Sequence, residues 1–143
     1  MKTYLVALDN SVRAPQVLAA ASELAESTGA KLVLFRAIGL PHDLPADTYA
    51  MSPDEVVEAL RRRATTELQE LARAVPMNVP HTTRLEVGAA WQAIGIVARE
   101  VGAQLIIIGS HGFSGVDRLL GTTASRVVNH ADRSVMVVRS TAP

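Results

Sequence analysis

Residues 105–123 read LIIIGSHGFSGVDRLLGTT, and this stretch decides the fold. It begins with Leu105–Ile108, a continuous apolar run of strand length, and continues directly into three glycines within seven residues. A short apolar run that ends in a glycine-rich turn is typical of a buried strand that leads into a helix. The spacing of the later apolar residues predicts that helix over Thr122–His130 and a last strand over Ser134–Val138.

The same order of strand and helix occurs three times before this stretch. Apolar or alternating runs predict strands at Tyr4–Leu8, Lys31–Ile38 and His81–Val87. Apolar residues at helical spacing follow each strand, and the first and third of these helices end at Gly29 and Gly102. Strands that alternate with helices pair in parallel through right-handed crossovers. We therefore expect an α/β, doubly wound, Rossmann- or flavodoxin-like open sheet of five mostly parallel strands with helices on both faces.

The second helix has a defined start, because Ser52 caps it, Pro53 needs no N–H partner there and Glu55 completes a capping box. The segment before it, GLPHDLPADTYAM, has no periodicity and is long for a loop in a compact domain, which makes it a candidate for function or mobility. The run Arg61–Arg63 cannot lie entirely on the apolar face of the helix, so we interpret it as a solvated surface.

The composition fits a single globular domain over residues 1–143 and argues against several classes of partner. Hydrophobic residues make up 48% of the chain and charged residues 20%. Fourteen basic side chains balance fourteen acidic ones, so no net field attracts nucleic acid or an anionic membrane. Five aromatic residues are too few for a platform that stacks the bases of a single strand.

The absence of cysteine excludes disulfides, thiolate nucleophiles and thiolate metal sites, and it fits a reducing compartment. The first ten residues, MKTYLVALDN, contain a short apolar run that meets Asp9 before any small-residue cleavage site, so they do not match a signal peptide. No run approaches the roughly 18 apolar residues of a membrane span. We expect a cytoplasmic protein with neither a membrane nor a nucleic acid as partner.

In an open parallel sheet, ligands bind beyond the carboxyl ends of the strands, where successive connections leave for opposite faces. This rule selects the turn that begins at Asp9, the end of the second strand, and Gly109–Gly115. Glycines at such a turn let backbone N–H groups approach an anion, although they also suit a turn that is merely tightly packed. Gly121, Thr122 and Thr123 add donors at the start of the last helix, and two donor clusters suit a polyphosphate. The spacing matches neither G-x-G-x-x-G nor the P-loop.

Three stretches of the chain resemble the universal stress protein family. Residues 109–138, GSHGFSGVDRLLGTTASRVVNHADRSVMVV, resemble its C-terminal signature. Residues 5–11, LVALDNS, resemble its first strand and acidic turn, and residues 86–112 resemble the segment from its third strand to its fourth. The resemblance implies a regulatory protein of the stress response that binds an adenine nucleotide, ATP or AMP, and acts as a homodimer, with ATP hydrolysis slow at most.

The resemblance also implies the positions of the ligand. ATP-binding members of the family are recognised by G-x2-G-x9-G-[S/T], but only eight residues, Phe113–Leu120, separate the second and third glycines here. The shorter loop can change how many phosphates fit or which nucleotide is preferred. Asp9 corresponds to an acidic residue near the ribose or the metal, and a carboxylate there suits Mg²⁺. The expected nucleotide-binding residues are Ala7, Asp9, Ala37, Ile108, Gly109, His111, Gly112, Gly121, Thr122 and Thr123.

Several of these residues have a second interpretation. Asp9 also suits a cap for the first helix, and His111 either donates to a phosphate or faces solvent. Two other functions therefore remain beside the nucleotide-binding regulator. One is a nucleotide-free dimeric interaction protein, which the shortened loop permits. The other is a phosphoester enzyme that uses Asp9 and a metal, and it is the weakest because no lysine or arginine finger is evident beside the glycines.

The C-terminal part of the chain leads to two further expectations. From Gly109 onward it holds two aspartates and four arginines, an excess of positive charge where phosphates are expected, at Arg118, Arg126, Arg133 and Arg139. Val135–Val138 is an apolar strand at an expected sheet edge, and pairing with the same strand of a second subunit would cover it, as the family resemblance also implies. Since aromatic residues are scarce, adenine would be held by aliphatic side chains and main-chain hydrogen bonds.

Overall fold

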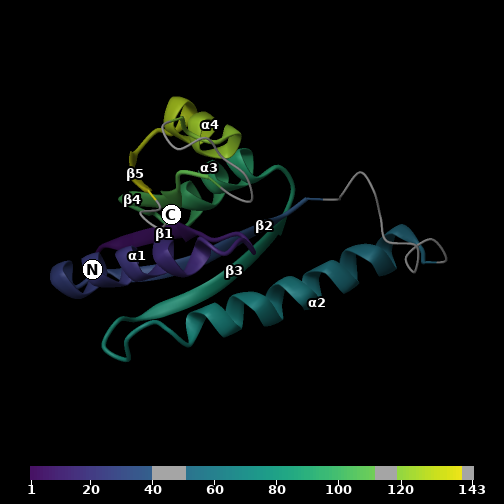
Figure 1. The fold of residues 1–143 in the computed structure, drawn as a ribbon, viewed down its shortest axis with the longest axis horizontal. Helices are drawn as coiled ribbons and strands as arrows, with labels where there is room; N and C mark the ends of the chain where they lie inside the picture. Colours follow the sequence, from purple (N-terminus) through teal and green to yellow (C-terminus); the bar gives the residue numbers. More distant parts are fainter. Residues whose placement is uncertain (40–50, 112–118, 140–143) are drawn as a thin grey trace.

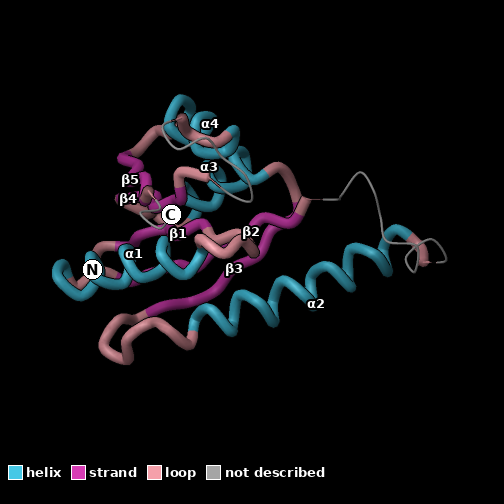
Figure 2. Tube along the Cα trace, viewed as in Figure 1, coloured by secondary structure: helices cyan, strands magenta, loops and turns pink. Residues whose placement is uncertain are grey.

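The computed structural model describes residues 1–39, 51–111 and 119–139. Figures 1 and 2 show a sheet with helices on both sides, and within the described residues the strands follow the order β3-β2-β1-β4-β5. All four neighbouring strand pairs are parallel. The strands are β1 Thr3–Ala7, β2 Lys31–Ile38, β3 His81–Val87, β4 Leu105–Gly109 and β5 Ser134–Val138, and the helices are α1 Ala14–Thr28, α2 Pro53–Ala72, α3 Ala90–Glu100 and α4 Thr122–His130.

This arrangement confirms the expected doubly wound α/β fold. The chain starts in the central strand β1, builds the sheet outward through β2 and β3, and then crosses to the other side of β1 for β4 and β5. The order of the strands therefore reverses between β1 and β4. In folds of this kind, such a reversal creates a crevice at the carboxyl ends of the two strands.

Two apolar cores lie on the two faces of the sheet. On one face, Val6, Leu34 and Ile107 pack with α1 and with Leu68 of α2. On the other face, Leu5 and Ile106 pack with residues of α3 and α4. Because helices cover both faces, the central strands are continuously apolar rather than alternating.

Local signals in the sequence explain several helix ends. Gly29 follows α1 with φ of 73°, a left-handed conformation that glycine adopts without strain. Ser52 caps α2 as predicted, its Oγ accepting the Glu55 N–H over 3.2 Å. In the run Arg61–Arg63, Arg62 and Arg63 are exposed and Arg61 is half-buried, in agreement with a largely solvated surface.

The last strand lies at an edge of the sheet, as predicted. β3 and β5 are the outer strands of the order formed by the described residues, and Val135–Val138 is half-buried rather than buried. The proline-rich segment before α2 falls mostly within residues 40–50, outside the described part of the chain. None of the helices in the described ranges is long and apolar enough to cross a membrane.

Candidate functional site

A cavity of about 230 Å³ opens at the carboxyl ends of β1, β2 and β4. Its walls are completed by the first residues of α1, α3 and α4. It therefore lies at the reversal of strand order, where the topology predicts a ligand. Its described lining residues are Ala7, Leu8, Asp9, Ser11, Arg13, Ala14, Val17, Phe35, Ala37, Ala90, Ile94, Ile108, Gly109, Ser110, His111, Gly121, Thr122, Thr123 and Ala124.

The turn after β1 is closed by two short polar contacts. The Ser11 N–H donates to Asp9 Oδ1 over 2.9 Å, and the Arg13 N–H donates to Ser11 Oγ over 3.3 Å. The N-cap of α1 is Arg13, and no side chain caps this helix end. The alternative interpretation of Asp9 as the cap of the first helix is therefore wrong, because its carboxylate closes the preceding turn and lines the cavity instead.

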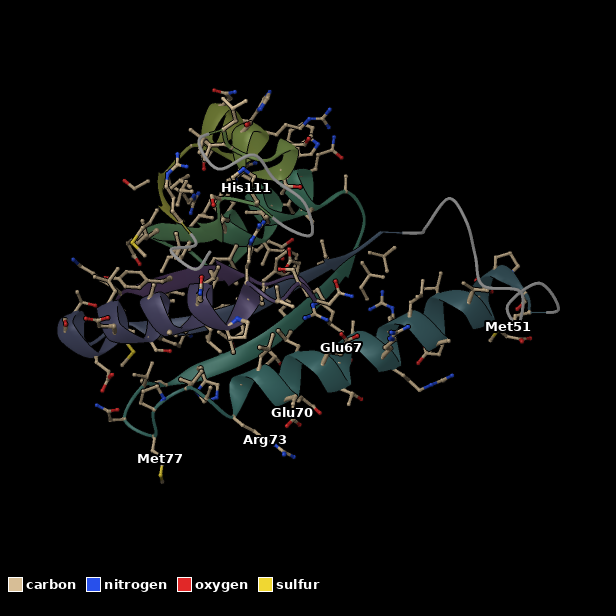
Figure 3. All side chains as sticks on the ribbon, in the orientation of Figure 1. Met51, Glu67, Glu70, Arg73, Met77 and His111 are labelled. Carbon is tan, nitrogen blue, oxygen red and sulfur yellow. The ribbon has the colours of Figure 1, made fainter. Side chains whose placement is uncertain are left out.

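Arg36 stabilises this turn through hydrogen bonds to its main chain, and sequence reasoning missed this residue. The side chain is buried, with the whole residue 7% exposed, although it lies in the apolar strand β2. Its Nε donates to the Leu8 carbonyl over 3.1 Å, and its Nη2 donates to the Asp9 carbonyl over 2.8 Å. Glu67 of α2 lies 3.6 Å from Nη1 and balances the charge. Figure 3 shows Glu67 on the side of α2 that faces the sheet. The signal in the sequence was a charged residue inside the run KLVLFRAI.

The turn after β4 packs closely against the start of α4. The Gly121 N–H donates to the Ser110 carbonyl over 2.7 Å. A Cβ on Gly121 would lie 3.2 Å from the Ser110 carbonyl oxygen and 3.5 Å from His111 Cα, so a larger residue here would require this turn to shift by a few tenths of an ångström. No side chain caps the N-terminus of α4, so the donors of Thr122 and Thr123 lie beside the cavity at the positive end of the helix dipole.

His111 lines the same side of the cavity and is labelled in Figure 3. Its Nδ1 lies 3.2 Å from Ser110 Oγ, within hydrogen-bond distance. Its Nε2 is buried and has no hydrogen-bond partner among the described residues. A buried ring nitrogen without a partner is costly, which makes this atom a candidate to bind a ligand.

The start of α3 forms a third wall. Gly88, with φ of 146°, turns the chain after β3, and its N–H donates to the Ile38 carbonyl over 2.9 Å. Ala90 and Ile94 then line the cavity. Sequence reasoning missed these two positions, because an alanine and an isoleucine at helical spacing resemble any core residues of a helix.

The structure brings nine of the ten expected residues together in this lining, and the tenth, Gly112, lies outside the described residues. The C-terminal arginines within the described residues do not line the cavity, and Arg118 lies outside the described part of the chain. Arg126 lies over the Trp91 ring at 5.7 Å, and Arg133 donates to one carbonyl at the end of α3 and to one just after it. Neither lines the cavity, and nor does Arg139. The cation in the described lining is Arg13, from the opposite end of the sequence.

Three comparisons place this geometry among known proteins. The model of the universal stress protein family matches residues 1–139. Universal stress protein A homolog 1 of Coxiella burnetii is 29% identical over 144 residues, covering 96% of this chain and 95% of that protein. The crystal structure of a universal stress protein family member from Burkholderia pseudomallei is 29% identical, with a TM-score of 0.75 over 97% of this chain and 96% of the other.

Two solved structures with the same fold contain nucleotides. A universal stress protein in complex with cAMP is 24% identical, with a TM-score of 0.62 over 96% of each chain. The universal stress protein from Archaeoglobus fulgidus in complex with dAMP is 22% identical, with a TM-score of 0.59 over 96% of this chain and 97% of the other. At this level of identity the two likenesses establish the fold alone.

Proposed function

This chain belongs to the universal stress protein family, and from that premise we propose that it is a regulatory protein of the stress response that binds ATP or another adenine nucleotide. The observation that carries the proposal is the cavity at the reversal of strand order, which is lined by nine residues expected from the sequence to bind a nucleotide. The complexes of two family members with cAMP and dAMP add support for an adenine nucleotide as the ligand.

The base would occupy the apolar part of the cavity. Ala7, Ala37 and Ile108 line it at the ends of three neighbouring strands, and Phe35 adds a buried aromatic ring. Small side chains at positions 7 and 37 leave the main chain accessible, and main-chain N–H and C=O groups can read the polar edge of adenine. The base would therefore be held between aliphatic walls, with its specificity set by the backbone.

The phosphates would occupy the side formed by β4 and α4. Gly109 and the uncapped residues Gly121–Thr123 offer backbone donors there, and the two threonines add hydroxyl groups. The buried Nε2 of His111 would gain the hydrogen-bond partner that the described residues do not give it.

A magnesium ion would have to be held mainly by the nucleotide. Asp9 is the carboxylate among the described lining residues, and the described part of the chain has no group of three or more histidine, aspartate or glutamate side chains that could bind a metal. Mg²⁺ commonly binds one carboxylate together with phosphate oxygens and water, so a single aspartate fits this role. The metal would neutralise phosphate charge beside Asp9, which would otherwise repel the nucleotide.

Calorimetric titration with ATP and AMP tests the proposal directly. We expect binding to the wild-type protein at millimolar nucleotide or below, and weaker ATP binding with Mg²⁺ present for Asp9→Ala. Asp54→Ala is the matched control, because Asp54 is exposed at the start of α2 and should leave the affinity unchanged. No binding of either nucleotide would favour the nucleotide-free interaction protein, which the shortened glycine loop permits. Adenine nucleotide released from freshly purified, denatured protein would exclude that alternative.

We also propose that the protein is a homodimer formed through β5. This strand is at one edge of the described sheet, and its residues Val135–Val138 are apolar but only half-buried. Pairing of two such edges about a two-fold axis satisfies their backbone groups and covers their side chains. Light scattering at micromolar concentration should give twice the mass of the chain, and Val137→Lys should shift the mass toward the monomer. A monomeric wild-type protein would contradict the proposal.

A cytoplasmic location also stays a prediction, supported by the absence of cysteine.

A further inference from the structure

Arg13 is the feature of the cavity that the site described above does not explain. The ionisable side chains in the described lining are Asp9, Arg13 and His111. Arginine keeps its charge at any physiological pH. Arg13 is therefore the permanent cation of this lining, although it lies 96 residues before Gly109, the first glycine of the phosphate side.

The position of Arg13 is unfavourable for the helix that it begins. It is the N-cap of α1 and provides no capping hydrogen bond from its side chain. Serine, threonine, aspartate and asparagine are the usual residues there, and a cation lies at the positive end of the helix dipole. At the start of α2 the chain does use such a residue, Ser52. A residue that breaks a local rule at the edge of a cavity is a candidate for function.

The packing of α1 places Arg13 beside the phosphate side of the cavity. A Cβ on Gly109 would lie 3.1 Å from Val17 Cγ2, so the first turn of α1 lies directly against the end of β4. Arg13 also lines a narrow crevice next to the cavity, together with Gly109, Ser110 and His111. The helix α1 covers one face of the sheet and α4 the other, so Arg13 approaches the phosphate side from the face opposite to Gly121–Thr123.

We propose that Arg13 makes the cavity selective for nucleotides with more than one phosphate. This inference rests on the proposed nucleotide site and specifies which class of nucleotide the site prefers. The backbone donors of β4 and α4 hold one phosphate, and the guanidinium of Arg13 binds those further along the chain from the other side. A guanidinium binds phosphate oxygens with two parallel hydrogen bonds, which a monophosphate held at the first position does not reach.

The test compares ATP and AMP binding by wild type, Arg13→Ser and Arg13→Lys, with the melting temperature of each free protein. For Arg13→Ser we expect the Kd of ATP to rise at least about tenfold and the Kd of AMP to change less than about threefold. The melting temperatures show that each variant is folded at the temperature of the titration. A residue with only a structural role would weaken the binding of ATP and AMP alike. Arg13→Lys, which keeps the charge, should recover part of the ATP affinity.

Arg126→Ser is the matched control, because Arg126 is exposed on α4 and outside the described lining, and it should change neither affinity. Equal losses of ATP and AMP affinity in Arg13→Ser, or no loss of either, would overturn the role of Arg13 and leave the nucleotide site standing. Wild-type protein that binds no adenine nucleotide would overturn the proposed function, and this inference with it.

Discussion

Arg36 Nη2 donates to the backbone carbonyl of Asp9 over 2.8 Å, so a buried charge on β2 fixes the turn that carries the cavity's carboxylate. The same guanidinium also binds the Leu8 carbonyl and lies near Glu67 of α2. Carbonyls at the end of a central strand have no further strand residues to pair with them. Arg36 satisfies two of them at once and connects the turn to the helix layer on that face of the sheet.

Replacing Arg36 with methionine should destabilise the protein by about 3 kcal/mol or more. The variant would leave the Leu8 and Asp9 carbonyls without these donors and Glu67 without its buried partner. Because the turn would loosen as well, ATP affinity should fall together with stability. Urea unfolding followed by circular dichroism measures the first effect, and calorimetry at a temperature where the variant is folded measures the second.

Arg63→Met is the matched control for this experiment. Arg63 Nε lies 3.5 Å from the same Glu67, but its side chain is 78% exposed. Exposed ion pairs contribute about 1 kcal/mol or less, so the stability of this variant should stay close to that of the wild type. Similar losses in the two variants would show that burial of the Arg36 charge does not matter.

The fold was predictable because each strand and helix has a local signal. The helix Thr122–His130 and the strands Lys31–Ile38, His81–Val87 and Ser134–Val138 have the predicted limits. The first strand is shifted by a single residue, Thr3–Ala7 instead of Tyr4–Leu8, because a continuous apolar run does not mark where strand pairing ends. The site residues at the carboxyl ends of the strands were predictable, because the topology rule and the family resemblance both indicated them.

Arg13 and Arg36 were not predictable, because their roles depend on residues far away in the chain. Arg36 binds the main chain of Leu8 and Asp9, which have no side-chain pattern that identifies them as acceptors. Arg13 lines the same crevice as Gly109 only because α1 packs on β4, where Val17 lies against Gly109. The count of charges along the sequence pointed to the C-terminal arginines as neighbours of the phosphates. Such a count carries no information about which side chains lie close together in space.

Gly121→Ala should destabilise the protein by about 1 to 2 kcal/mol and weaken nucleotide binding. The backbone φ of −64° accepts alanine, but the new Cβ would lie 3.2 Å from the Ser110 carbonyl oxygen and push α4 away from the turn after β4. Gly95→Ala serves as the control, because a Cβ there would meet nothing within 4 Å. Since Gly95 is inside α3, alanine should stabilise that variant by up to about 1 kcal/mol. The two variants should therefore change the unfolding free energy in opposite directions.

Arg133→Met should lower the free energy of unfolding by about 2 to 3 kcal/mol. Arg133 Nη1 donates to the carbonyls of Ala98 and Ala103 over 2.9 and 2.7 Å, and so it satisfies acceptors at the end of α3 and just after it. Its side chain is 18% exposed. Arg99→Met removes an arginine that is 68% exposed and also pairs with Asp132, and it should cost less than about 1 kcal/mol. Thermal unfolding of both variants would show whether these carbonyl contacts, rather than the charge near Asp132, stabilise the loop before β5.

Asp132→Asn should destabilise the protein near neutral pH but not in strong acid. The hydrogen bond from Arg133 lowers the pKa of Asp132 below its ordinary value of 3.8, and the nearby charges of Arg133 and Arg99 act in the same direction. A group whose pKa is lower in the folded state adds stability above its unfolded pKa, and this stability is lost as the pH falls through the folded pKa. The difference in unfolding free energy between wild type and variant should therefore be largest from about pH 5 to 7 and shrink below about pH 4. Because the carboxylate is exposed, added salt should reduce the difference as well. A difference that stayed constant from neutral pH into acid would show that the charge of Asp132 is not what stabilises the loop.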